Sequence, residues 1–170
     1  MESMAYQKIL FRTAMCVMAC DGEIHDSEIE EIRLAYEQTD FFRDLVFKTE
    51  LELVLNDFKR DEKKVVMEYF NHLTSSDLTP VQELQILEII LRIIYADDRI
   101  DKNEVLFLQA VKSKLNVPDE IFYKRFGEVS CMQIGHMESK LVPEENKFLD
   151  GFELSGIINL NEVLEKSENE

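Results

Sequence analysis

The hydrophobic positions of this chain recur with the 3.6-residue period of α-helices over most of its length. Two long apolar segments, residues 5–20 and 81–96, carry only narrow polar stripes, and Lys8 and Arg12 form that stripe in the first. A stripe of this width predicts a helix that is buried over most of its circumference. Pro80 directly precedes the second segment, where the missing N–H of proline is not needed, and it therefore marks a helix start.

Shorter amphipathic segments occupy much of the rest of the chain up to Gly127. Apolar residues at helical spacing predict further helices within residues 29–36, 51–58, 65–70, 105–115 and 122–126. Alternation with period two, the pattern of a half-buried strand, is nearly absent before Gly127. The expected fold class is therefore all-α.

One acidic turn occurs twice along the chain, with matched positions 76 residues apart. The copies are residues 21–28 and 97–104, which share the pattern Asp-x-x-Ile-x-x-x-Glu. Each copy follows one of the two long apolar segments, so the pattern predicts two pseudo-repeats built around a turn between helices. Gly22 in the first copy indicates a backbone position with positive φ, such as a helix C-terminal cap, and Asp98 occupies the matching place in the second.

The turns resemble the second half of an EF-hand calcium loop, but the first half does not fit. Aligning Gly22 with the invariant glycine of that loop places Val17 and Ala19 at its first and third positions. Calcium requires oxygen ligands at these positions, and neither side chain has one. The sequence therefore excludes an EF-hand.

The acidic residues of the turns have a structural and a functional interpretation. Residues 101–104 match a capping box, in which Glu104 reaches back to the helix start, and residues 27–30 allow another box in the first copy. Asp21 and Asp97 are harder to explain in this way, because an acid at a helix C-terminus opposes the helix macrodipole. Cation binding and helix capping both remain open for these turns.

The charge balance restricts the partners of the protein. The chain has 19 basic and 35 acidic side chains and a net charge of −16. Such a surface repels nucleic acid and disfavours anionic membranes, whereas it attracts cations and basic protein segments. Arg92 interrupts the best apolar run before it reaches the ~20 residues that span a bilayer, so no transmembrane segment is expected, although peripheral membrane association is not excluded.

No catalytic constellation emerges from the remaining residues. The three histidines form no HxxxH or HExxH pair, and no glycine-rich phosphate loop occurs. Cys16 and Cys20 lie one helical turn apart in an apolar segment and are expected to be buried thiols, which suits a reducing cytoplasm. We therefore expect a cytoplasmic protein that is not an enzyme.

A helical chain with two turns of the form Ala/Cys-Asp-Gly-x-Ile-x-x-x-Glu resembles the tellurite-resistance TerB-like family. The resemblance rests on residues 20–28 and 96–104 and covers about residues 4–127, and it departs from the family at Asp98, where glycine is usual. It implies a compact bundle of about seven helices with internal pseudo-symmetry and the two turns close together. It also implies an acidic, metal-binding site for a divalent cation whose candidate ligands are Asp21, Glu28, Asp97 and Glu104.

These observations predict a TerB-like helical domain over residues 1–127. Residues 128–170 are expected to form an extension of short helices packed on that domain, with the end frayed from Glu165. The favoured function is divalent-cation binding or sensing in a bacterial stress response, with other proteins as expected partners. The alternative is a protein-interaction module, similar to the TerB-like segment of some co-chaperones, in which the acidic turns are only structural.

Overall fold

The computed structural model describes residues 2–20, 22, 24–96 and 100–127, with side chains from Ala5 onward. Over these residues the chain forms seven helices and no strand, so the all-α prediction is confirmed. The helices are α1 (Glu2–Ala19), α2 (Asp26–Gln38), α3 (Phe47–Arg60), α4 (Glu62–Ser75), α5 (Pro80–Ile94), α6 (Lys102–Lys114) and α7 (Asp119–Phe126). None of these helices is both long enough and apolar enough to cross a membrane.

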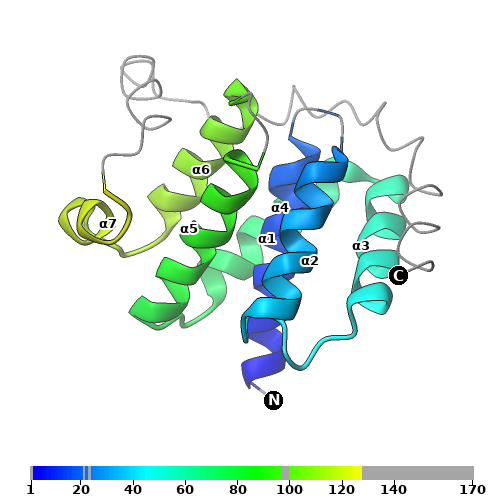
Figure 1. Cartoon of the computed structure of the whole chain (residues 1–170), viewed down its shortest axis with the longest axis horizontal. Coiled ribbons are helices and arrows are strands. Elements are labelled where there is room, and N and C mark those ends of the chain that lie inside the picture. Colours follow the sequence, from blue (N-terminus) through cyan, green and yellow to red (C-terminus); the bar gives the residue numbers. More distant parts are fainter. Residues whose placement is uncertain (1, 21, 23, 97–99, 128–170) are drawn as a thin grey trace.

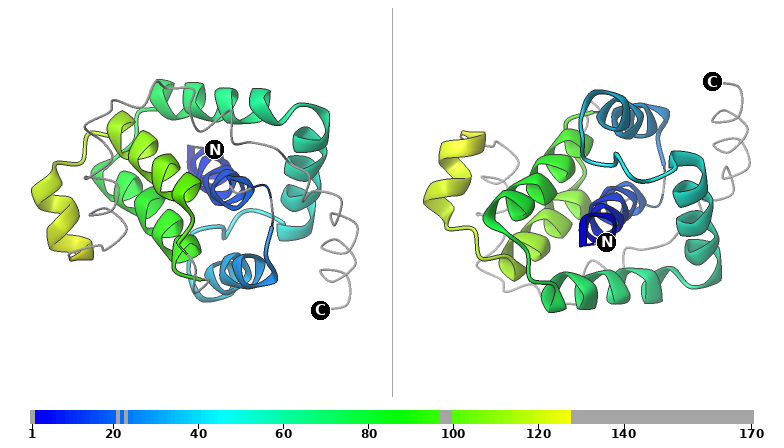
Figure 2. Two further views of the ribbon diagram at one scale, coloured as in Figure 1. Left: turned by 90° about the horizontal axis from the view of Figure 1, so that it is seen from above. Right: turned by 90° about the horizontal axis from the view of Figure 1, so that it is seen from below.

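Helix α1 runs through the middle of the bundle (Figure 2), and it packs against α3, α4, α5 and α6. Its residues from Ala14 to Ala19, and Cys20 after it, are completely buried, whereas Lys8 is exposed and Arg12 is partly exposed on the polar stripe. The arrangement follows from the sequence, because a helix with so little polar surface is stable in water only when other helices surround it.

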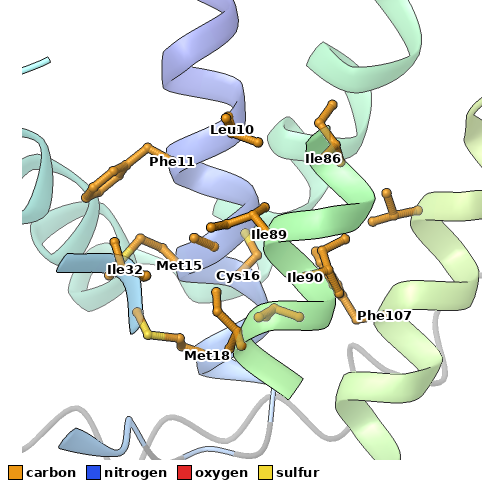
Figure 3. Close-up of a cluster of buried hydrophobic side chains, with 14 of the residues drawn as sticks. Leu10, Phe11, Met15, Cys16, Met18, Ile32, Ile86, Ile89, Ile90 and Phe107 are labelled. Atoms are coloured by element: carbon orange, nitrogen blue, oxygen red, sulfur yellow. The ribbon is translucent and has the colours of Figure 1, made fainter. Parts of the chain in front are cut away.

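Helices α1 and α5 form the core pair and run side by side in the same direction. Figure 3 shows Leu10 level with Ile86, and Cys16 beside Ile89 and Ile90. Leu10, Cys16 and the three isoleucines are completely buried. Burial of such side chains contributes about 1.5–3 kcal/mol each relative to exposure, so this contact is a main source of stability.

The start of each of several helices is fixed by a local cap. Thr79 and Gln82 form a full capping box at α5, with Gln82 N–H donating to Thr79 Oγ1 (3.2 Å) and Thr79 N–H donating to Gln82 Oε1 (3.0 Å). Pro80 is the first residue of α5, as the sequence predicts. At α4, Asp61 Oδ1 accepts the Lys64 N–H at 3.2 Å. These bonds satisfy N–H groups that have no partner within the helix.

Candidate functional site

The two acidic turns follow the ends of α1 and α5, which lie at the same end of the bundle (Figure 1). After the turns, α2 packs on α5 and α6 packs on α1, so each turn leads into a helix that contacts the core helix of the other copy. Helices α2 and α6 are both 13 residues long and begin 76 positions apart. The offset of the turns in the sequence therefore extends to the helices that follow them.

In the first turn, Glu28 is buried and its carboxylate is used as a helix cap. Its side chain is 1 % exposed, and its Oε2 accepts the His25 backbone N–H at 3.0 Å. His25 is the residue before α2, so the capping box spans residues 25–28. The box that the sequence predicts at residues 27–30 is therefore wrong by two positions, because the helix begins at Asp26, before Ser27.

In the second turn, Asp101 caps α6 from the position equivalent to His25. Its Oδ1 accepts the N–H groups of Asn103 (2.7 Å) and Glu104 (3.4 Å), which confirms the predicted role of the aspartate. Glu104 is 3 % exposed and stands at the third position of α6, as Glu28 does in α2. Both turns therefore end at a buried glutamate in the first turn of the next helix.

The other two candidate ligands, Asp21 and Asp97, lie outside the described residues. Glu28 and Glu104 lie at corresponding places in their helices, at the end of the bundle where the two turns begin. Within the described part of the chain, no three His, Cys, Asp or Glu side chains are grouped closely enough to hold a metal ion. A cation site at this end would therefore depend on Asp21 and Asp97.

The backbone and apolar residues of the turns differ between the two copies. Gly22 is buried and has φ +82°, which confirms the predicted positive φ. Ile24 is partly buried and packs on the core, whereas its counterpart Ile100 is 37 % exposed. Tyr95, at the end of α5, is 47 % exposed. The second turn therefore has one exposed apolar side chain just before it and one within it.

A second pair of buried polar residues, which sequence reasoning missed, holds the loops that follow α2 and α6. Gln7 Oε1 accepts the Asp44 N–H at 2.7 Å, and Gln7 Nε2 donates to Asp44 Oδ2 at 2.8 Å. Glu83, 76 positions later, accepts the Asn116 N–H at 3.0 Å and the Asn116 side-chain amide at 3.4 Å. Both side chains are at most 5 % exposed. The sequence does contain a signal for this pair, because each of the two apolar segments has a polar residue at positions that are 76 residues apart.

Two buried titratable groups away from the turns, Cys16 and Tyr69, are held in their neutral forms. Burial raises the pKa of the Cys16 thiol to about 12, although the Arg12 charge acts against it. Burial also raises the pKa of Tyr69 above its ordinary range, and the Tyr69 hydroxyl is hydrogen-bonded to Thr13 Oγ1 at 2.7 Å. Cys16 and Cys20 are completely buried, as expected from the sequence, and Cys20 Sγ donates to the Cys16 carbonyl. These groups have the environment of core residues.

Comparison with known proteins places this arrangement in a family. The family model described as tellurite resistance protein TerB matches residues 10–125, which include both acidic turns and nearly all of the seven helices. A search of curated proteins and a search of solved structures each gave no match. The family match covers more than half of the chain and agrees with the residues that carry the resemblance in the sequence. The chain therefore belongs to the TerB family of tellurite resistance proteins.

Proposed function

We propose that this TerB domain is a non-enzymatic module that binds a divalent cation at the end of the bundle where α1 and α5 end. Asp21 and Asp97 would be the primary ligands, and Glu28 and Glu104 would assist them. The observation that supports the proposal is the burial of Glu28 and Glu104 at equivalent places beside the two turns. A buried carboxylate is unfavourable unless hydrogen-bond donors or a cation offset the loss of its hydration.

The chemistry of these four residues suits a hard cation. Carboxylate oxygens are the preferred ligands of calcium and magnesium, whereas structural zinc sites are built mainly from cysteine and histidine. Glu28 donates no proton when ionised and has about four lone-pair positions, so its bond to the His25 N–H does not exhaust its capacity. A bound cation would also offset the unfavourable position of Asp21 and Asp97 after the C-terminal ends of α1 and α5.

Cation binding would serve sensing or signalling, because the free energy of binding would stabilise the two turns. We propose the cytoplasm of a bacterium under stress as the setting, which suits a family described by tellurite resistance. A ligand that binds only the folded state stabilises it by RT ln(1 + [L]/Kd), which is about 2.7 kcal/mol at a hundred times Kd. A change in cation concentration would therefore be reported as a change in local order at this end of the bundle.

A second candidate is a protein-interaction module whose turns are architectural. The observation that favours it is the exposure of Tyr95, just before the second turn, and of Ile100 within it. The capping bonds of Glu28 and Asp101 also give two of the acids a structural role without a metal. In this case Tyr95 and Ile100 would contact another protein, and no cation would be needed.

The two candidates are separated by thermal unfolding of metal-stripped protein titrated with calcium, magnesium, zinc and manganese. The test variant is Asp21→Asn/Asp97→Asn, and the control is Asp40→Asn/Asp77→Asn, which changes two exposed aspartates by the same chemistry. Cation binding predicts a saturable rise in the midpoint with one metal, kept in the control and lost in the test variant. If no metal raises the midpoint and the test variant is at least as stable as the parent, cation binding is refuted. The interaction module would then be the remaining candidate.

A further inference from the structure

The corner between α3 and α4 is basic, although the protein as a whole is strongly acidic. Four of the 19 basic residues, Lys59, Arg60, Lys63 and Lys64, lie within six positions there, and all four are exposed. We call these four residues the basic corner. It lies at the end of the molecule opposite to α7, as Figure 1 and both views of Figure 2 show.

The acids near the basic corner neutralise it only in part, because Asp61 and Glu62 leave a net charge of +2 over residues 59–64. Asp61 uses its carboxylate to cap α4, and Asp57 pairs with Arg12 at 2.8 Å. Lys64 has only a 3.9 Å contact with Glu68. Within the part of the chain that the structure describes, neither Lys59 nor Lys63 has an ion pair. The basic corner therefore presents an excess of positive charge to solvent.

The position of these lysines is unfavourable for the helix itself. Lys63 and Lys64 are the second and third residues of α4, where the positive end of the helix macrodipole repels cations. They also lie beside Lys59 and Arg60 in the last turn of α3. An arrangement that opposes local electrostatics, with only the Lys64–Glu68 contact to offset it, is expected where a ligand supplies the opposite charge.

An apolar side chain accompanies the positive charge. Met67 lies four positions after Lys63 and three after Lys64, so the three side chains share one face of α4. Met67 is 56 % exposed. The ligand that fits this face is therefore a polypeptide that has both carboxylates and apolar side chains, because a small anion would leave Met67 exposed.

The same chain contains a segment of this chemistry. Residues 128–170 have ten acidic and three basic side chains, and apolar clusters occur among residues 141–161. The segment begins after Gly127 at the end of α7, and its 43 residues can extend to roughly 140 Å, enough to reach across a small domain. Residues 1–127 have 25 acidic and 16 basic side chains, so most of the domain would repel the segment.

We propose that the acidic C-terminal region, residues 128–170, docks on the basic corner of its own chain. Its carboxylates pair with the lysines at the end of α3 and the start of α4, and an apolar residue of the region covers Met67. The pairing relieves the repulsion among the four cations and the unfavourable helix position of Lys63 and Lys64. This docking is independent of cation binding at the turns, which lie between other helices.

The test is carbodiimide cross-linking of the full chain, which joins lysine amines to carboxylates that contact them. Equal amounts of ¹⁴N and ¹⁵N protein are mixed so that mass spectrometry separates links within one chain from links between two chains. We expect links within one chain from Lys59 and Lys63 to acids beyond residue 127. At 1 M salt, where the Debye length is about 3 Å, their yield should fall at least about fivefold.

Two variants make the result specific to the basic corner. In Lys63→Glu/Lys64→Glu, which favours the α4 dipole and keeps the helix, the yield of the link from the remaining Lys59 should fall to a similar extent. The control Lys124→Glu changes an exposed lysine on α7 and should leave that yield unchanged. Links only between two chains, no links from the corner, or an unchanged Lys59 yield in the double variant would each overturn the proposal.

Discussion

The hydrogen bonds between Glu83 and Asn116 allow a quantitative test of how the loop after α6 is held. Glu83 lies in the first turn of α5 and is 5 % exposed. It accepts the Asn116 backbone N–H at 3.0 Å and the side-chain amide at 3.4 Å. Gln7 makes the corresponding contact to the Asp44 backbone in the first half of the chain. An amide oxygen therefore already serves this purpose once in the same protein.

The expected costs follow from these contacts. Glu83→Ala removes a charged acceptor of two hydrogen bonds, and because Asn116 is itself exposed to water the loss should be about 2 kcal/mol of unfolding free energy. Glu83→Gln keeps an acceptor for the Asn116 N–H and loses the charge near the α5 N-terminus, so about 0.5–1 kcal/mol is expected. At 2–4 °C per kcal/mol for a chain of this size, the alanine variant should melt about 4–8 °C lower.

Urea and thermal unfolding, followed by circular dichroism at the helical band, measure both variants. The matched control is Glu120→Ala, which removes an exposed glutamate from the first turn of α7 and should stay within about 0.5 kcal/mol of the parent. Equal losses in Glu83→Gln and Glu83→Ala would show that charge, and not the acceptor, holds the loop. An alanine variant as stable as the control would refute the reasoning altogether.

Three further outcomes follow from the core and the first turn. Burial raises the pKa of Tyr69 above that of tyrosine in the unfolded chain. The contribution of neutral Tyr69 to the unfolding free energy is therefore full below about pH 10 and is lost as the pH rises beyond that value. Tyr69→Phe should flatten this alkaline loss in a series of melting midpoints, at a cost of about 1 kcal/mol at neutral pH for the lost bond to Thr13. Cys16 and Cys20 should react with iodoacetamide only as fast as the protein unfolds, and rapid labelling at pH 8 in peptide maps would contradict their burial. Gly22→Ala should lower the unfolding free energy in urea by about 1–2 kcal/mol, because Gly22 has φ +82°, and a neutral effect would mean that the turn adjusts.

The fold class could be predicted from the sequence because its determinants are local. The polar stripe of Lys8 and Arg12 defines which side of α1 meets solvent, and Pro80 marks the first residue of α5. These features act within one or two turns of helix, so a single sequence contains them in full. The family match to residues 10–125 agrees with the same turns.

The register of the first cap could not be predicted by local rules alone. Serine is preferred at helix N-caps, and Ser27 with Glu30 satisfies the capping-box pattern. The structure instead buries Glu28 and begins α2 at Asp26, because Ile29 and Ile32 must face the core. The second copy contained the answer, since Asp101 and Glu104 predict residues 25 and 28 when the 76-residue offset is applied.

The polar residues of the core were the part that sequence reasoning missed. Gln7 and Glu83 are of residue types that usually face solvent, and their burial depends on loops 37 and 33 positions away. No local pattern reports such a contact, because it forms only when the helices have packed. The 76-residue offset between Gln7 and Glu83 is visible in the sequence. It can be interpreted only when the structure shows which loops the two side chains bind.

Four of the five buried polar side chains in the described residues fall into two pairs with the same 76-residue offset. Gln7 and Glu83 hold the loops after α2 and α6, and Glu28 and Glu104 lie in the first turns of those two helices. Each acidic turn is therefore followed by a helix that is anchored at its start and just beyond its end. A ligand at the turns would meet supports that are already ordered and would lose little free energy to reorganisation. A metal-dependent rise in melting midpoint that disappears in Asp21→Asn/Asp97→Asn would consequently report lost ligands, because the anchoring contacts are made by other residues.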